Sequence, residues 1–535
     1  MSNAAKAASA AAPLTTGSLD GVAERLGKVR NYAAAVIVAW FALAVSSAWL
    51  PTPDSALYLM LGRSVAQGHG YALDGHPHAY VPPGFPYMLA ALERVGLGSM
   101  LCLNAAMALI GLATVWMSYL LVSELASRPV AVLVACLLGF NSLLHVMSAL
   151  QLSDMPFTLL VLAGLYGLLR GLRGERFALE LGTLAILASC WVRVAGASLA
   201  VACAVGLLLQ PRATSRLRVW ANVGTLVLGV AATLGVFYAQ YQNTLRAEHS
   251  LPPASYMAGL QALYAQPVGS LIKRTLGNVF ESAAEIPRFL MGLQGNPVVA
   301  LAVCLLPALV GVGRRLMHRE FLVALAVAGY ASGIVMNLPA GARYLLPVAP
   351  LLILYYLEGL TILLDWRPRV RRWAPAALVV FIAAFVTFNG VKGAYVMHKN
   401  AHQIADTREA IATCADWLHA YAKPGDHFLS CDSEWQMAYL SEVPYMQLDR
   451  WVIIAGKSRE EYLRFLYDQG VRLVVSVPEH LSHYPDEGLI RDAVRDTRMF
   501  QPLAANEHHH LYRFVAPPAV ATAVASTRTG GPVLQ

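Results

Sequence analysis

Two isolated aspartates stand out in a sequence that is otherwise strongly apolar. Asp54 follows a long apolar run in WLPTPDSALY, and Asp154 precedes another in QLSDMPF. Either residue suits the N-cap of a helix, because a short acidic side chain accepts hydrogen bonds from the first backbone N–H groups. A carboxylate at a helix start beside low-dielectric lipid is also well placed to act as a general base. The sequence leaves both interpretations open for both residues.

Two arginines interrupt apolar sequence in a similar way. Arg193 lies in WVRVAG, and Arg343 lies in AGARYLLP with Tyr344 after it. A guanidinium presents a planar fork of N–H donors that matches the oxygens of a phosphate or pyrophosphate group. The alternative is that both side chains extend to lipid headgroups.

A third cationic group lies in SLIKRTLGNVFESAAEIPRFLMG. Apolar residues recur there at helical spacing, and Lys273, Arg274 and Arg288 accompany them. This pattern predicts an amphipathic helix at a membrane surface. Lys273 and Arg274 then either bind the phosphate of a membrane-borne anionic ligand or rest on headgroups.

The stretch after Asp54 predicts a short surface helix, SALYLMLGRSVAQG, followed by a tight turn. Tyr58 lies four residues after Asp54 and shares its helix face. Tyr71 follows in GHGY. Pro83 and Gly84, in VPPGFPYMLA, form a rigid turn into another short helix, since proline fixes φ and glycine permits an unusual one. We expect these four residues, two tyrosines and the Pro-Gly pair, to shape a pocket wall.

Three histidines lie in the same segment: His69, His76 and His78. A zinc site needs ligands that close a tetrahedron, and the His-Pro-His spacing does not establish one. We therefore assign no metal ligand and no certain cofactor, and leave a role for a divalent metal open.

The composition identifies the class of protein that must position these residues. Of 535 residues, 57% are hydrophobic and 13% are charged, whereas about 25% are charged in an ordinary globular domain. Mean hydropathy is +0.51. We predict a polytopic α-helical membrane protein. The net charge of +8 comes from arginines in short loops, where it reports orientation, so nucleic acid is excluded as a partner.

A span needs about 20 apolar residues, and this criterion predicts about eleven. They are residues 31–50, 101–123, 129–147, 156–170, 177–192, 194–210, 219–240, 295–313, 321–337, 344–364 and 373–391. No cleavable signal peptide precedes them, so the first is expected to be a retained anchor.

Arginine-rich and arginine-poor loops alternate through these spans. The set SRP, RGLRGER, PRATSRLR, GRRLMHRE and DWRPRVRRW is cytoplasmic by the positive-inside rule, together with residues 1–30. Residues 51–100, residues 241–294 and everything after 391 then lie outside. Asp54 and Asp154 fall on that outer side at similar depth, which favours an acid pair over two unrelated caps.

Residues 392–517 change character. Charge rises, and TREAIATCADWLHAYA and SREEYLRFLYDQG show helical spacing before β-rich runs. We predict a small extracytoplasmic α/β domain, followed by a disordered tail over 518–535. Cys414 and Cys431 could form a disulfide there, which two cysteines alone do not establish. No Asn-x-Ser/Thr sequon occurs, which favours a bacterial source and hence the inner membrane.

Several motifs together resemble one enzyme family. They are an acid at the end of the first span, then GHGY, PPGFP, SDMPF before the fourth span and ARYLLPVAP at the tenth. In order and topology they resemble the polyprenyl-phosphate-sugar-dependent glycosyltransferases of the GT-C superfamily. Nearest in pattern are the lipid A aminoarabinose transferases, the bacterial protein O-mannosyltransferase-like enzymes and the rhizobial lipopolysaccharide galacturonosyltransferases.

The resemblance implies an inverting sugar transfer from a polyprenyl-phosphate donor. It assigns Asp54 as the main catalytic acid and Asp154 as the second, and places Arg343 and Tyr344 near the donor phosphate. Eukaryotic protein mannosyltransferases usually have Asp-Glu at the first position, whereas Ser55 follows Asp54 here. The acceptor therefore stays open between lipid A, an envelope glycan, a protein and another lipid.

Two other functions fit a polytopic membrane protein. A transporter or lipid flippase usually places ionisable groups at the bilayer midplane, whereas the informative charges here lie at one face. A polysaccharide polymerase or ligase would use a diphosphate-linked donor instead of a monophosphate.

Overall fold

The computed structural model describes most of the chain. The described residues are 17–28, 30–43, 45–73, 76–79, 81–210, 214–247, 267–291, 297–337, 341–366, 372–430, 433–445, 458–477 and 487–515. The chain divides into two compact units. The helical unit comprises Met1–Trp49, Val81–Gln240 and Gly259–His398, and the sheet unit comprises Leu50–Tyr80, Tyr241–Ala258 and Lys399–Gln535.

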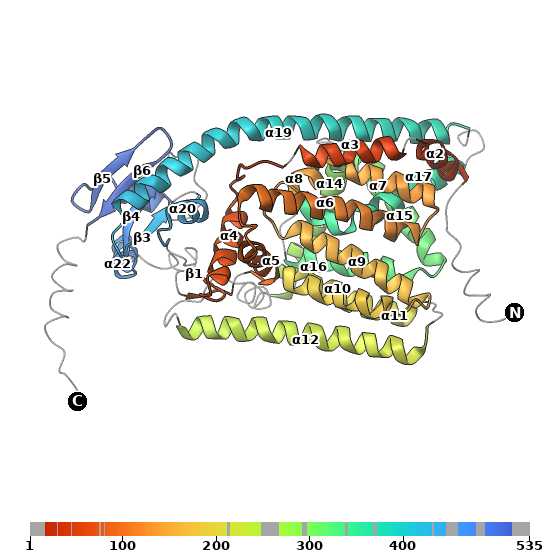
Figure 1. Cartoon of the computed structure of the whole chain (residues 1–535), viewed down its shortest axis with the longest axis horizontal. Helices are drawn as coiled ribbons and strands as arrows, with labels where there is room; N and C mark the ends of the chain where they lie inside the picture. The colour runs from red at the N-terminus through yellow and green to blue at the C-terminus, as the bar shows by residue number, and fades with distance from the viewer. Residues whose placement is uncertain are drawn as a thin grey trace. The chain divides into compact units, whose positions relative to one another are not determined.

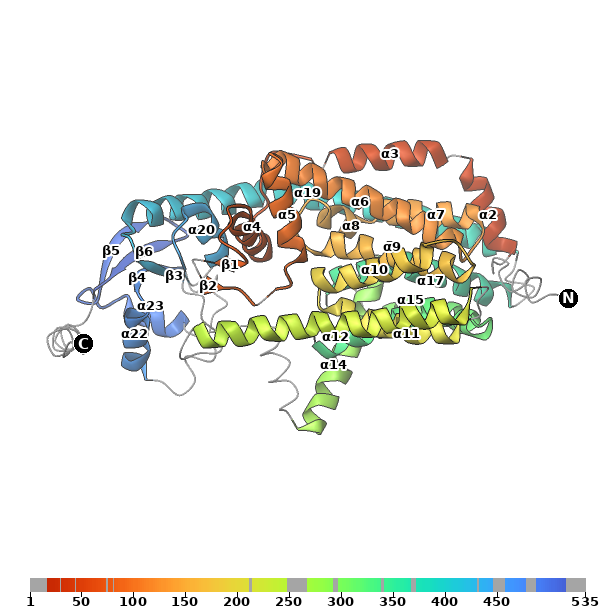
Figure 2. The same cartoon turned by 60° about the horizontal axis from the view of Figure 1, so that its bottom comes forward.

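The helical unit is a bundle of roughly parallel and antiparallel helices (Figures 1 and 2). In chain order its described elements are α2 (Gly17–Gly27), α3 (Arg30–Ala42), α5 (Gly84–Arg94), α6 (Met100–Ser123), α7 (Arg128–Gly139), α8 (Ser142–Met147), α9 (Asp154–Leu172), α10 (Ala178–Val192), α11 (Ala195–Leu209), α12 (Arg216–Ala247), α14 (Val268–Met291), α15 (Pro297–Met317), α16 (Phe321–Asn337), the 3-10 helix η1 (Ala342–Val348), α17 (Ala349–Asp365) and the first part of α19 (Ala374–Tyr421).

Each of the eleven predicted spans overlaps a described helix. Among the described residues, five helical stretches are long and apolar enough to cross a membrane: α6, α9, Arg216–Asn243 of α12, η1 with α17, and Ala374–Val396 of α19. Four more are apolar but shorter: α7, α10, α11 and most of α16. The stretch 129–147 is divided between α7 and α8. The count of eleven stays a prediction.

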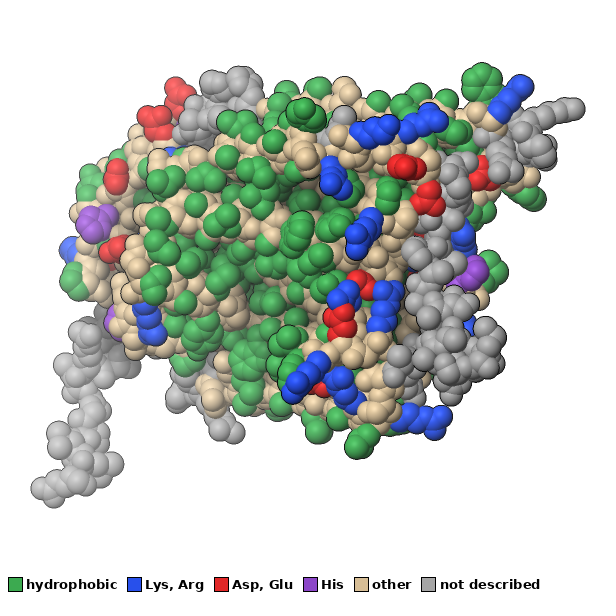
Figure 3. All heavy atoms as spheres, turned by 45° about the vertical axis from the view of Figure 1, so that its right-hand side comes forward, with side chains coloured by type: hydrophobic (Ala, Val, Ile, Leu, Met, Phe, Trp, Pro, Cys, Tyr) green, Lys and Arg blue, Asp and Glu red, His purple; other side chains and the backbone are tan. Residues whose placement is uncertain are grey.

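Side chains on the molecular surface separate by type. In Figure 3 apolar side chains cover a broad area, and the Lys and Arg side chains in view gather mostly to one side of it. Trp116, Leu181 and Leu228, on three different helices, are each more than half exposed. Such exposure of large apolar groups is expected where lipid, and not water, surrounds the helices.

Helices α9 and α10 pack unusually closely because glycines line their contact. A Cβ on Gly167 would lie 2.8 Å from Cα of Gly182, and one on Gly182 would lie 2.5 Å from the backbone nitrogen of Leu168. Small residues let backbones approach in this way in membrane bundles. The two helices lie side by side in both views and follow one another through a short turn. The start of α9 is thereby placed beside the end of α10.

One arginine that the sequence assigned to a cytoplasmic loop is fully buried. Arg315 lies in the last turn of α15. Its guanidinium donates two hydrogen bonds to the carboxylate of Glu358 on α17, and the distance from Nε to Oε2 is 2.9 Å. It also donates to Glu320 at 2.7 Å and to the carbonyl of Leu125 at 2.9 Å. Arg315 therefore connects α15 with α17 and with the residues that follow α6. It is also one of the arginines that the sequence counted as charge of a cytoplasmic loop.

The sheet unit is built around a four-stranded sheet of order β3-β4-β6-β5, in which β3 and β4 are parallel and the other pairs antiparallel. Its described elements are α4 (Pro53–Ala66), β1 (Ala72–Leu73), β2 (His76–Pro77), the end of α19, β3 (His427–Ser430), α20 (Glu434–Ser441), α22 (Arg459–Asp468), β4 (Val471–Ser476), α23 (Glu487–Ala493), β5 (Phe500–Ala505) and β6 (His510–Phe514).

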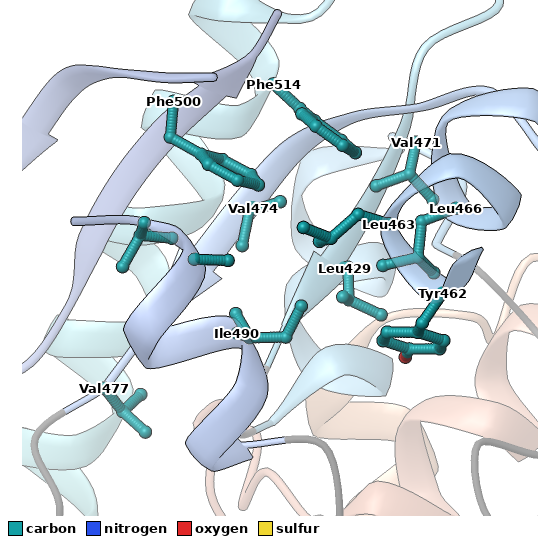
Figure 4. Close-up of a cluster of buried hydrophobic side chains, with 12 residues drawn as sticks. Leu429, Tyr462, Leu463, Leu466, Val471, Val474, Val477, Ile490, Phe500 and Phe514 are labelled. Atoms are coloured by element: carbon teal, nitrogen blue, oxygen red, sulfur yellow. The ribbon is translucent and has the colours of Figure 1, made fainter. Parts of the chain in front are cut away.

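Each face of this sheet carries a buried apolar cluster, to which neighbouring strand residues contribute in turn because they point to opposite sides. Leu429 packs in a cluster with Tyr462 and Ile490 of α22 and α23, which Figure 4 shows. Phe428 packs in the opposite cluster with Leu418 of α19 and residues of α20. Residues 399–515 thus contain a sheet with helices packed against both of its faces, which is an α/β arrangement.

The predicted domain limits stay predictions. Helix α19 runs without a break through residue 392, so no helix end marks that boundary. Cys414 is a buried free thiol, and Cys431 lies outside the described residues, as does the tail 518–535. The predicted amphipathic helix in 241–294 is present as α14.

Candidate active site

Asp154 and Arg193 form a buried ion pair in the helical unit. The distance from Asp154 Oδ1 to Arg193 Nη1 is 2.6 Å, and the two side chains are 6% and 14% exposed. Arg193 Nη1 also donates to Ser153 Oγ at 3.4 Å. The close crossing of α9 and α10 explains the pair, since Asp154 begins α9 and Arg193 directly follows α10.

The positions of both charges suit the helix ends that carry them. Asp154 is the first residue of α9, where a negative charge is favourable, and Arg193 is the C-cap of α10, where a positive charge is favourable. Arg193 has an extended backbone between α10 and α11. Of the two interpretations that the sequence left open, the N-cap does not apply to Asp154: Ser153 occupies that position, and the Asp154 carboxylate is directed to Arg193.

Helix η1 adds Arg343 and Tyr344 to this pair. The guanidinium carbons of Arg193 and Arg343 lie 5.4 and 5.1 Å from the centroid of the Tyr344 ring, within cation–π range. Arg343 Nη2 also donates to Tyr344 Oη at 3.1 Å. The structure therefore brings together four residues that sequence reasoning selected separately. We call Asp154, Arg193, Arg343 and Tyr344 the arginine cluster.

Tyr330 and Phe157 pack next to the arginine cluster, and the sequence did not indicate either residue as part of the site. Tyr330 of α16 is buried, and its hydroxyl donates to the carbonyl of Tyr344 at 2.9 Å. Its ring lies 5.8 Å from that of Phe157, one turn into α9. A tyrosine within the apolar AVAGYASG was the available signal, because a buried tyrosine hydroxyl usually needs a partner.

The PPGFP motif contacts the same region. Helix α5 begins at Gly84, with Pro83 as its N-cap, as predicted for a turn leading into a short helix. A Cβ on Gly84 would lie 2.6 Å from the carbonyl oxygen of Trp191, two residues before Arg193. Gly84 does not adopt a positive φ. Glycine is required at position 84 because the backbone of Trp191 approaches it closely.

Asp54 lies in the sheet unit, in the first turn of α4, and its side chain is half-buried. It is not the N-cap. Thr52 is, in a reciprocal capping box: Ser55 N donates to Thr52 Oγ1 at 3.2 Å, and Thr52 N donates to Ser55 Oγ at 3.1 Å. The helix start therefore does not depend on the Asp54 side chain for capping.

The predicted residues between Asp54 and residue 80 also lie in the sheet unit. Tyr58 is buried on α4, and the Tyr71 ring meets the buried His78 ring edge-on at 5.7 Å. Burial lowers the pKa of His78 to about 3, so this ring is neutral at physiological pH. His69 is exposed, and the His76 side chain lies outside the described residues.

Lys273 and Arg274 are exposed on α14. They accompany an exposed apolar stripe of Val268, Ile272 and Leu276. The predicted helix is present, and the assignment of Lys273 and Arg274 to the donor phosphate stays a prediction. In the part of the chain that the structure describes, no three His, Cys, Asp or Glu side chains lie close enough to hold a metal ion.

Comparison with known proteins gives matches among solved structures alone. No protein-family model matches the chain, and no curated protein does. Apo ArnT from Cupriavidus metallidurans superposes with a TM-score of 0.57 at 14% identity, covering 92% of this chain and 98% of that one. The same protein bound to undecaprenyl phosphate gives 0.53. The Archaeoglobus fulgidus oligosaccharyltransferase tethered with an acceptor peptide gives 0.50 at 11% identity, covering 84% and 69%.

The chain has the GT-C fold. The resemblance drawn from the sequence motifs predicted this fold, and that prediction is confirmed. Within the GT-C fold of this chain, the arginine cluster is the densest grouping of predicted site residues that the structure shows. The predicted pairing of Asp54 with Asp154 stays a prediction.

Proposed function

We propose that this protein is an integral-membrane glycosyltransferase that moves a sugar from a polyprenyl-phosphate donor to an extracytoplasmic acceptor. The observation that carries the proposal is the arginine cluster within a GT-C fold. A structural neighbour with that fold binds undecaprenyl phosphate, which is a ligand of the chemistry that two guanidinium groups recognise.

The charge of the arginine cluster suits a monophosphate leaving group. Two guanidinium groups and one carboxylate leave a single net positive charge. A sugar phosphodiester donor carries one negative charge, and the released lipid phosphate carries up to two. The cluster therefore stabilises the charge that develops on the leaving oxygen more than it stabilises the bound donor, which is the condition for catalysis.

Asp54 is the proposed general base. Its carboxylate takes the proton of the acceptor hydroxyl while that oxygen attacks the anomeric carbon. The bond from the anomeric carbon to the phosphate oxygen breaks on the opposite side, its electron pair stays on the phosphate, and the configuration inverts. Ser55 and Thr52 cap the helix, so the Asp54 carboxylate can serve this role without loss of the helix start.

Asp154 acts through Arg193 in this proposal. Its oxygen accepts a charge-assisted hydrogen bond from the guanidinium, so it orients the phosphate-binding side chain and keeps a buried arginine paired. Arg343 and Tyr344 complete the phosphate site, and Lys273 and Arg274 are proposed to attract the donor at the membrane surface.

The test is sugar transfer by the purified chain in nanodiscs. A panel of radiolabelled sugars, each linked to undecaprenyl monophosphate or to undecaprenyl diphosphate, is incubated with cell-envelope extract containing lipid A, glycan and protein. We expect label in one acceptor fraction from a monophosphate donor. Transfer from the diphosphate lipid alone indicates a polymerase or ligase. Movement of the donor across vesicles without transfer indicates a flippase. Either result contradicts the proposal.

A further inference from the structure

Helix α4, which carries Asp54, is attached to helix α20 through one arginine further along its length. Arg63 Nη1 lies 3.2 Å from Glu442 Oε1, and Nη2 lies 3.4 Å from Tyr439 Oη. The guanidinium carbon lies 4.9 Å from the centroid of the Tyr439 ring. A hydrogen bond, an ion pair and a cation–π contact therefore converge on a single side chain, within the sheet unit.

Helix α20 is itself fixed to the sheet. Its Met437 is fully buried in the cluster beneath β3. At the end of α20, the carbonyl of Ser441 lies 3.1 Å from Nδ1 of His419 on α19. Met60, which precedes Arg63 by about one turn of α4, packs against the same cluster. Arg63 thus joins α4 to a rigid part of the sheet unit.

The backbone of Glu442 gives a second, independent indication. Glu442 is the C-cap of α20 and has a φ of 57°, a left-handed conformation that favours glycine because a Cβ is strained there. Backbone preference therefore gives no reason for glutamate at this position. The contact of its carboxylate with Arg63 gives a reason for glutamate at position 442.

The contact contributes little to stability. The Arg63 and Glu442 side chains are 36% and 73% exposed, and exposed ion pairs are weak because water screens them. Helix α4 also has its own capping box. The three contacts of the Arg63 guanidinium instead fix the orientation of α4 relative to α20.

We propose that Arg63 is a positioning residue: through Tyr439 and Glu442, the sheet unit holds α4 in the orientation in which the Asp54 carboxylate accepts the proton of the acceptor hydroxyl. The inference rests on the proposed function, which makes Asp54 the base. It gives the C-terminal sheet a part in the chemistry, although none of its residues needs to touch the sugar.

Glu442→Gly is the decisive variant, because it removes the carboxylate and relieves the left-handed strain together. We expect the melting temperature to be unchanged or raised and kcat to fall about tenfold, since small misplacement of a catalytic group costs rate steeply. KM for the undecaprenyl-phosphate sugar should not change, because donor binding belongs to the arginine cluster. Hydrogen–deuterium exchange in the peptide covering 53–66 should become faster.

Arg63→Gln should give the same fall in kcat, and Arg63→Lys should restore part of it. Arg513→Gln is the matched control. It breaks another ion pair of the sheet unit, with Asp426 at 2.7 Å, and should lower the melting temperature while leaving kcat unchanged.

Wild-type kcat in both Glu442→Gly and Arg63→Gln overturns the inference, whether or not exchange in α4 is faster. A rise in donor KM without a fall in kcat overturns it as well. The two proposals fail differently. If Asp54→Asn keeps its activity, the proposed base is wrong; if Asp54→Asn is inactive while the Arg63 and Glu442 variants are normal, only the positioning role is wrong.

Discussion

Asp54 and Asp154 look alike in the sequence, and the structure places them in different environments. Each lies in the first turn of a helix, and neither is its N-cap. Asp154 is buried against Arg193 at 2.6 Å, whereas Asp54 is half-buried on a helix that Thr52 caps. In the proposed mechanism these two similar motifs hold acids with different tasks: Asp154 orients a cation, and Asp54 takes a proton.

The strongest test of this comparison is Asp54→Asn. Removing a general base typically lowers the rate by two to four orders of magnitude, so we expect transfer to fall about a thousandfold. The start of α4 should stay intact in this variant, because Thr52 and Ser55 form its capping box, so the loss of transfer should far exceed any loss of thermal stability. Radiolabelled transfer and thermal denaturation in detergent measure the two effects. Near-normal transfer by this variant would remove Asp54 from the mechanism.

Asp154→Asn should lower thermal stability and donor binding more than it lowers the rate of the chemical step. It leaves Arg193 buried without its charged partner, and breaking a buried pair from one side costs about 3 kcal/mol or more. We therefore expect a clear loss of thermal stability together with a raised KM for the donor. If Asp154→Asn loses transfer while keeping its stability and its donor KM, the two acids share one role and the comparison is wrong.

Gly84→Ala should disturb the backbone next to Arg193 and leave Asp54 unaffected. Its Cβ would lie 2.6 Å from the Trp191 carbonyl, and overpacking of this kind costs about 1–3 kcal/mol. We expect KM for the donor to rise about tenfold. Gly235→Ala is the control, because a Cβ at Gly235 meets nothing within 4 Å. If the two variants have the same KM for the donor, the PPGFP turn does not influence the arginine cluster.

Acid should weaken the sheet unit through His78. Its pKa is lowered by burial to about 3 from the ordinary value near 6.5. Between these values the unfolded chain binds the proton and the folded chain does not, so stability falls as pH falls, by about 1.4 kcal/mol per pH unit. Exchange protection of the segment 71–79 should drop from pH 6.5 towards pH 4. His78→Gln should reduce that dependence; an unchanged pH profile would contradict it.

Tyr330→Phe should give the smallest effect. It removes one buried hydrogen bond to the Tyr344 carbonyl, worth about 1 kcal/mol. We expect KM for the donor to rise a few-fold with kcat unchanged. Tyr355→Phe, which changes another fully buried tyrosine of the helical unit, serves as the control. No difference between the two would show that η1 is held without the Tyr330 hydroxyl.

Sequence reasoning located the members of the arginine cluster because charge is costly beside lipid, so each isolated charge in an apolar run stood out. It did not predict their contacts, which depend on the glycine crossing of α9 and α10. It left open whether the two aspartates are N-caps, although Thr52 and Ser55 showed the spacing of a capping box.

Two arginines show where sequence information ends. Arg315 was interpreted as loop charge and is buried against Glu358. Arg63 meets Glu442, a residue 379 positions away in the chain. No local pattern reports such a pairing, because it depends on how distant segments fold together.

The capping box at α4 has a consequence for tolerance to mutation. A residue that also starts a helix cannot be varied without cost to folding, and Thr52 with Ser55 takes over that constraint from Asp54. Helix capping should therefore not restrict position 54 in a saturation library selected for protein abundance, whereas selection of the same library for activity should leave very few side chains there. Positions 52 and 55 should show depletion in both.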